Sequence, residues 1–179
     1  MRRSLALGFL LLSGPLAAEE PRSDAPLDGS HFFIGPSLQA VQSFGGTGSS
    51  YGGPASAFGL QMLVDSGNWM FGGELRVGVV RSPSLFISSW GRIDRYLQPG
   101  TSALYAGGSF GFLDEFDGEY YGGEGASAGA QVGYLWGRAR RWGRIALELQ
   151  LTVPLFGERA NKPGNYVYPF VSLGVRFFL

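Results

Sequence analysis

The chain has 179 residues, a length that suits one domain rather than two. Hydrophobic residues make up 45% of it and charged residues 16%, against roughly 25% charged residues in an ordinary soluble domain, which predicts little water-facing surface. The formal net charge of zero argues against a nucleic-acid partner. The lack of cysteine excludes disulfides, thiolate zinc sites and cysteine nucleophiles.

The first thirty residues have the pattern of an exported protein. Arg2 and Arg3 form a positive start, residues 5–12 form an apolar run, and small residues precede Glu19. The run is far shorter than the ~20 residues of a membrane-spanning helix. We therefore predict a cleaved signal peptide at 1–18, a polar leader at 19–30 and a folded domain at 31–179.

From Phe32 onward, apolar residues recur at every second position, the period of a β-strand. The clearest stretch is 144–155, where Ile145, Leu147 and Leu149 alternate with Glu148 and Gln150. The pattern in 85–97 is blurred, so the strand count is open there. Strands are predicted at 32–41, 58–64, 69–79, 85–97, 103–112, 126–136, 144–155 and 167–179. Their lengths approach the ~9–11 residues with which a tilted strand crosses a bilayer.

The predicted connections alternate between short and long. Turn residues mark short links at 65–68, 98–101 and 137–143. Longer Gly-rich or acidic segments lie at 43–56, 113–124 and 156–165, and the short link 81–83 is the exception. This alternation is typical of bacterial outer-membrane barrels. The sequence thus predicts an all-β fold, a closed antiparallel up-and-down transmembrane β-barrel of about eight strands.

The two faces of the strands differ in bulk as well as in polarity. The polar face is mostly Gly, Ala, Ser and Gln, which suits a narrow lumen, whereas the bulky apolar face would overfill one. In a low-dielectric interior the inward polar groups must pair with one another. The expected lumen network consists of Glu74, Arg76, Gln131, Arg144, Glu148, Gln150 and Arg176. We favour a packed, closed lumen; a narrow gated pore and a soluble lipocalin-like carrier with the leucines inward are the alternatives.

Aromatic residues gather near predicted strand ends, where girdles anchor a barrel at the membrane interfaces. The girdle candidates are Trp69, Trp136, Trp142, Tyr166, Tyr168 and Phe177. Ordinary sheet packing is the other interpretation of each of them.

Few residues suggest a catalytic or ligand-binding site. His31, the one histidine, precedes the first strand, so no Ser–His pair is predicted among the loops and we expect no enzyme, cofactor or metal site. The acidic segment 114–121 lacks the carboxylate spacing of a calcium loop, and a solvated loop is the preferred interpretation. Arg138, Arg140, Arg141 and Arg144 form a basic turn that either contacts anionic headgroups or stays solvated.

The end of the chain carries a family resemblance. Residues 166–179, with Val175, Phe177 and Leu179 alternating along them, resemble the C-terminal strand that the outer-membrane assembly machinery recognises, although Leu179 stands where Phe is usual. Residues 92–112 are similar to a hairpin of small outer-membrane barrels. The layout of 32–179 resembles the OmpA/OmpX/opacity-type group.

The resemblance implies a location in the bacterial outer membrane. It also implies contacts with outer-membrane lipids and lipopolysaccharide, and with the barrel-assembly machinery during biogenesis. We expect a monomer with a structural or surface-interaction role, and the pore and the carrier remain the alternatives.

Overall fold

The computed structural model describes residues 29–44, 54–81, 84–98, 100–117, 120–140, 142–158 and 169–179. The predicted signal peptide 1–18 and most of the leader lie outside these residues. The strands are β1 (Ser30–Ser43), β2 (Pro54–Ser66), β3 (Trp69–Arg81), β4 (Ser84–Tyr96), β5 (Ala103–Asp117), β6 (Tyr120–Trp136), β7 (Arg144–Glu158) and β8 (Phe170–Phe178).

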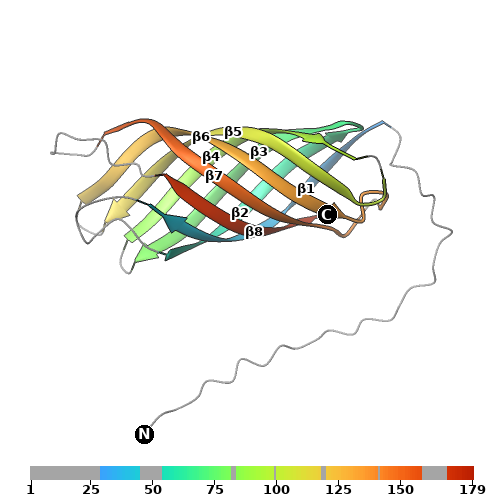
Figure 1. The fold of residues 1–179 in the computed structure, drawn as a ribbon. Coiled ribbons are helices and arrows are strands. Elements are labelled where there is room, and N and C mark those ends of the chain that lie inside the picture. Colours follow the sequence, from blue (N-terminus) through green and yellow to red (C-terminus); the bar gives the residue numbers. More distant parts are fainter. Residues whose placement is uncertain are drawn as a thin grey trace, which may run out of the picture.

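The eight strands form a closed barrel in which every neighbouring pair is antiparallel (Figure 1). Each strand pairs with the next along the chain, and β1 also pairs with β8, with Ser37 opposite Arg176. The predicted all-β, closed, up-and-down architecture is therefore confirmed, as is the strand in the blurred region 85–97, now β4. The described residues include no helix with the length and apolarity needed to cross a membrane.

The connections fall at two ends of the barrel. At one end, here called the turn end, residues 67–68, 97–102 and 137–143 join the strands, and Gly67 has a φ of 68° that favours glycine. At the opposite end, called the loop end, the connections are 44–53, 82–83, 118–119 and 159–169. Because the strand number is even, β1 starts and β8 finishes at the turn end.

One predicted loop is wrong. Residues 113–124 were expected to be a long connection because they are acidic and Gly-rich, but β5 continues to Asp117 and β6 begins at Tyr120, with these two residues paired. Strand pairing uses backbone groups and continues where the alternation of side chains has stopped. The predicted short link at 81–83 is confirmed, because β3 ends at Arg81 and β4 begins at Ser84.

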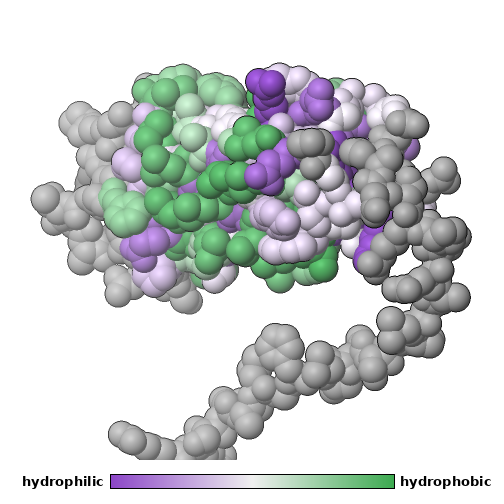
Figure 2. Space-filling model, turned by 45° about the vertical axis from the view of Figure 1, so that its right-hand side comes forward, coloured by the Kyte–Doolittle hydropathy of each residue, from purple (hydrophilic) through white to green (hydrophobic). Residues whose placement is uncertain are grey.

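The barrel turns most of its large apolar side chains outward and most of its polar side chains inward. On β3, Leu75 is 58% exposed while its neighbour Glu74 is 3% exposed. In Figure 2, green apolar residues cover much of the visible side of the barrel, and purple and pale residues gather toward its right-hand end. A lipocalin-like carrier requires the leucines to face inward, and this chain has the reverse arrangement.

Inward-facing glycines leave space for large side chains on adjacent strands. Gly133 on β6 is opposite Tyr105 on β5, and a Cβ at Gly133 would overlap the Tyr105 ring. A Cβ at Gly59 would overlap the Ser37 hydroxyl. The lumen is thus filled by large residues set against glycines.

Candidate functional site

The middle of the lumen holds six ionised side chains, here called the central network. Their side chains are almost fully buried, with none of the residues more than 7% exposed. Three are carboxylates and three are guanidinium groups, so their formal charges cancel. They come from four strands: Glu74 and Arg76 from β3, Arg92 and Asp94 from β4, Glu148 from β7 and Arg176 from β8. Burial of these charges is tolerable only because each is paired.

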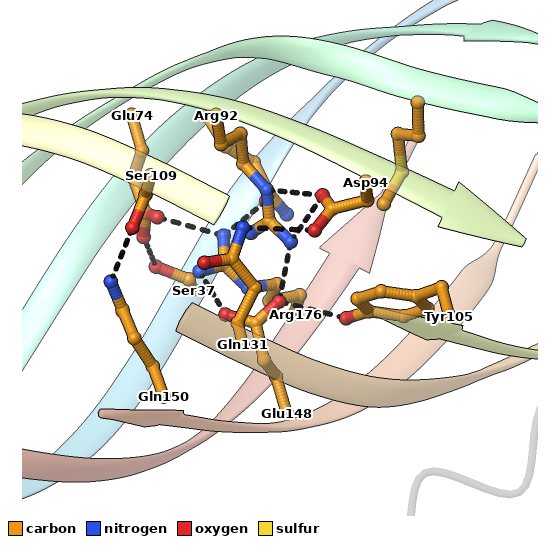
Figure 3. Close-up of polar contacts among 12 residues, drawn as sticks. Ser37, Glu74, Arg92, Asp94, Tyr105, Ser109, Gln131, Glu148, Gln150 and Arg176 are labelled. Carbon is orange, nitrogen blue, oxygen red and sulfur yellow. Dashed lines mark hydrogen bonds and ion pairs between the residues drawn. The ribbon is translucent and has the colours of Figure 1, made fainter. Parts of the chain in front are cut away.

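Glu148 lies between two of the arginines (Figure 3). Its Oε2 accepts from Nη2 of Arg92 at 2.6 Å, and its Oε1 accepts from Nη2 of Arg176 at 2.6 Å. The Tyr105 hydroxyl donates to the same carboxylate at 2.8 Å. Both carboxylate oxygens are therefore engaged by charge-assisted donors, the strongest class of hydrogen bond in proteins.

Arg176 links the two glutamates. Its Nη1 lies 2.7 Å from Oε2 of Glu74, while its Nη2 reaches Glu148. Glu74 also accepts from Arg76 at 2.8 Å and from the hydroxyl of Ser37 at 2.5 Å. A single side chain on the last strand thus joins carboxylates on β3 and β7 across the lumen.

Two buried glutamines form hydrogen bonds with members of the central network. Asp94 accepts from Nε of Arg92 at 2.7 Å and from the amide of Gln131 at 2.8 Å. Gln150 accepts from Arg76 at 2.9 Å and donates to Ser109 at 2.9 Å. The amides extend the hydrogen bonding to β5 and β6, so that charges and amides together tie strands around the barrel.

A second polar group, here called the turn-end cluster, surrounds Asp65. Arg144 lies 2.7 Å from its carboxylate and Arg138 lies 3.7 Å from it, and the Tyr96 hydroxyl donates to it at 3.1 Å. The guanidinium of Arg138 lies 3.7 Å from the centre of the Tyr96 ring, and that of Arg144 lies 3.9 Å from the Phe33 ring. The cluster has two guanidinium groups and one carboxylate, and the faces of the two rings stabilise the guanidinium groups.

An apolar layer separates the two polar groups. On β2, Leu63 lies between Gln61 and Asp65 on the inward face, and on β7, Ala146 lies between Arg144 and Glu148. The layer consists of Phe33, Leu63, Met70, Tyr96, Ala103, Tyr105, Leu135, Ala146 and Phe178. Between the two polar groups the lumen is therefore packed with rings and aliphatic side chains.

The expected lumen residues divide between these two groups. The structure connects six of them through hydrogen bonds in the middle of the lumen: Glu74, Arg76, Gln131, Glu148, Gln150 and Arg176. Arg144 belongs instead to the turn-end cluster, because it stands at the start of β7. Sequence reasoning missed Arg92 and Asp94, although their spacing of two within a strand places both on one face.

The predicted girdle residues that the structure describes all lie near the turn end. Trp69 begins β3, Trp136 ends β6 and Trp142 is in the connection before β7, with exposures of 44%, 46% and 73%. Phe177 is half-buried near the end of β8. Tyr166 and Tyr168 lie outside the described residues.

The residues of the expected assembly signal occupy β8 and its end. Val175 and Phe177 lie on the outward face, and the backbone N–H of Leu179 donates to the carbonyl of Ile34. The prediction that the arginines of the basic turn contact headgroups or stay solvated is wrong for Arg138 and Arg144. Both are buried and face the lumen, whereas Arg140 is exposed. The side chains of most of the acidic segment, and Arg141, lie outside the described residues. Among those described, no three His, Asp or Glu side chains group as metal ligands.

Comparison with protein-family models and with curated proteins finds no match for this chain. The central network is neutral and internally paired, and the apolar layer closes the side toward the turn end. Such an arrangement holds strands together and leaves no excess charge in the central network with which to attract an ion.

Proposed function

We propose that the chain is a bacterial outer-membrane β-barrel protein with a structural or surface-interaction role and no enzymatic activity. The observation that carries the proposal is the polarity of the barrel wall. Large apolar residues are exposed on every strand, among them Leu38, Leu75, Ile93, Leu149 and Leu173. Soluble monomers rarely expose contiguous apolar patches larger than a few hundred Å².

The placement of charges on the outside supports the same proposal. Among the outward-facing strand side chains that the structure describes, the charged ones are Arg95 and Asp114. Arg95 lies near the turn end of β4 and Asp114 toward the loop end of β5. The band between them is free of charge among those residues, as a hydrocarbon environment requires. Three exposed tryptophans at the turn end suit one interface of such a band.

The proposed role is to stabilise the envelope and to present the loop end to the surroundings. Its partners would be outer-membrane lipids, lipopolysaccharide and, during biogenesis, the barrel-assembly machinery, with the protein acting as a monomer. A closed lumen is part of this proposal, because paired charges and the apolar layer occupy the interior.

Cell fractionation combined with heat modifiability tests the location. We expect the protein in the outer-membrane fraction, with an unboiled sample migrating differently from a boiled one on an SDS gel. A soluble periplasmic protein that shows no shift would contradict the proposal.

A narrow gated pore is the second candidate, and Arg176 is the observation that favours it. This guanidinium lies 2.7 Å from Glu74 and 2.6 Å from Glu148, so a change of partner would open the middle of the network. Planar-bilayer recordings separate the candidates. The closed barrel predicts no openings over a wide voltage range, whereas discrete openings that disappear in Arg176→Met would favour the pore.

A further inference from the structure

The outer wall of the barrel is not uniformly bulky. Across β2 to β5 the outward side chains are small at Gly73, Gly91 and Gly108, and a groove of about 910 Å³ lies there. Gly73 is opposite Gly91, and Ile93 is opposite Gly108, so the small residues adjoin on neighbouring strands. The apolar walls of the groove are Leu60, Met62, Leu75, Ile93, Phe110 and Phe112.

The space above Gly91 and Gly108 is open, whereas a Cβ at Gly73 would lie 3.3 Å from the backbone carbonyl oxygen of Trp90. A Cβ at Gly91 would approach no heavy atom closer than 3.8 Å, and one at Gly108 none closer than 3.7 Å. This differs from the inward glycines, where a neighbouring side chain fills the space. The groove is therefore a hollow in the outer surface that a ligand can enter.

A cation lies in line with the groove on the same face of β4. Ser89, Gly91 and Ile93 line the groove, and Arg95 follows them toward the turn end. The guanidinium of Arg95 is exposed and lies 5.7 Å from the centre of the ring of Trp69, itself 44% exposed. Among the described residues, no carboxylate forms an ion pair with it.

We propose that this groove binds one acyl chain of a phospholipid whose anionic headgroup pairs with Arg95. The inference rests on the membrane location proposed above. From Ser89 to Arg95 the strand spans roughly 20 Å. At a tilt of about 45° that covers about 15 Å of depth, one leaflet of a ~30 Å hydrocarbon core. The apolar groove is about as long as the part of an acyl chain that lies in one leaflet. The guanidinium of Arg95, beside the Trp69 indole, is placed to pair with an anionic headgroup at the interface.

Native mass spectrometry of the full chain, purified from the membrane fraction of a Gram-negative host, tests the proposal. The protein is titrated in detergent with dioleoylphosphatidylglycerol and, separately, with the zwitterionic dioleoylphosphatidylcholine. We expect phosphatidylglycerol to bind about fivefold more tightly, the effect of about 1 kcal/mol from one interfacial arginine. Arg95→Gln should abolish that preference, and Gly91→Leu should reduce the binding of both lipids by filling the groove.

Two matched variants control for general effects. Ala40→Leu places the same side chain on the outward face of β1, and Arg140→Gln removes another exposed arginine at the turn end. Neither should change lipid binding. A heat-modifiable band for each variant shows that it is folded.

Four results would overturn the inference. Equal binding of both lipids by the unmodified protein excludes the headgroup contact, and equal losses in Ala40→Leu and Gly91→Leu exclude the groove. A dimer that Gly91→Leu dissociates would identify a second copy of the chain as the occupant. A protein absent from the membrane fraction overturns the proposed function as well, whereas a membrane-inserted barrel without lipid preference overturns only this inference.

Discussion

The lumen is closed in two different ways along its length. In the central network, three carboxylates and three guanidinium groups fill the space and cancel in charge. In the apolar layer next to it, rings and aliphatic side chains fill the space with no charge to balance. The same narrow barrel therefore accommodates either way of filling its lumen. Filling the lumen with charged groups requires that each charge is paired, and filling it with apolar groups requires that their side chains match the available volume.

The largest effect should come from unbalancing the central network. Glu148→Gln keeps the shape of the side chain but leaves Arg92 and Arg176 with one fewer carboxylate. We expect a loss of about 3–5 kcal/mol in the free energy of unfolding, because an uncompensated buried charge remains. Urea unfolding in detergent micelles, followed by tryptophan fluorescence, measures it.

A double variant separates charge balance from packing in that experiment. Glu148→Gln with Arg92→Gln restores equal numbers of positive and negative groups, so its loss should be smaller than the sum of the two single losses. Strictly additive losses would show that pairing does not govern the stability of the network.

The apolar layer should respond to volume instead. Leu135 is fully buried in it, and Leu135→Ala should cost about 3 kcal/mol through lost burial and a residual cavity. The conservative variant Leu135→Met should cost less than about 1.5 kcal/mol. If both variants were equally harmful in the same unfolding assay, the distinction between the two regions would lose its basis.

Overpacking should have a smaller effect than either. A Cβ in Gly133→Ala would overlap the Tyr105 ring, and we expect a cost of about 1–3 kcal/mol. Gly91→Ala is the matched control, since its Cβ has open space outside the barrel. Thermal unfolding of the two variants in parallel provides the comparison, and equal melting temperatures would contradict the account of the inward glycines.

The smallest effect should come from the outer surface. Arg95 has no ion pair among the described residues, so Arg95→Gln should change the free energy of unfolding by no more than about 0.5 kcal/mol. The variant nevertheless should lose lipid preference. A large loss of stability would instead make Arg95 a structural residue.

Much of the fold could be predicted because alternation survives in most strands. On β7, Leu147 and Leu149 face out while Glu148 faces in, as their order in the sequence indicates. The strand β4 was predicted, but which of its faces is inward was not, because its faces are mixed. The large Trp90 faces the lumen, while the small Gly91 and the charged Arg95 face outward. In such a strand the polarity and the size of the side chains indicate opposite faces as the inward one.

The candidate site was less predictable than the fold. The inward position of Arg144 and Arg176 follows from alternation, but their separation into two groups depends on how far each strand is staggered against its neighbours. Arg144 is opposite Phe178, whereas Arg176 is opposite Ser37 across the closing seam. The period of side chains along a single strand does not determine its register against a strand that is far away in the sequence.

Arg176 has a consequence for how the barrel reaches its final state. It meets Glu74 from 102 positions away along the chain and Gln61 from 115 positions away. Its strand, β8, is also the one that pairs with β1 to close the barrel. Glu74 and Glu148 therefore gain their shared guanidinium only when β8 is in place, and contacts of such long range slow folding. The pairing of β8 with β1 closes the wall, and the same strand brings in the third guanidinium of the central network, so closure and charge balance depend on one strand.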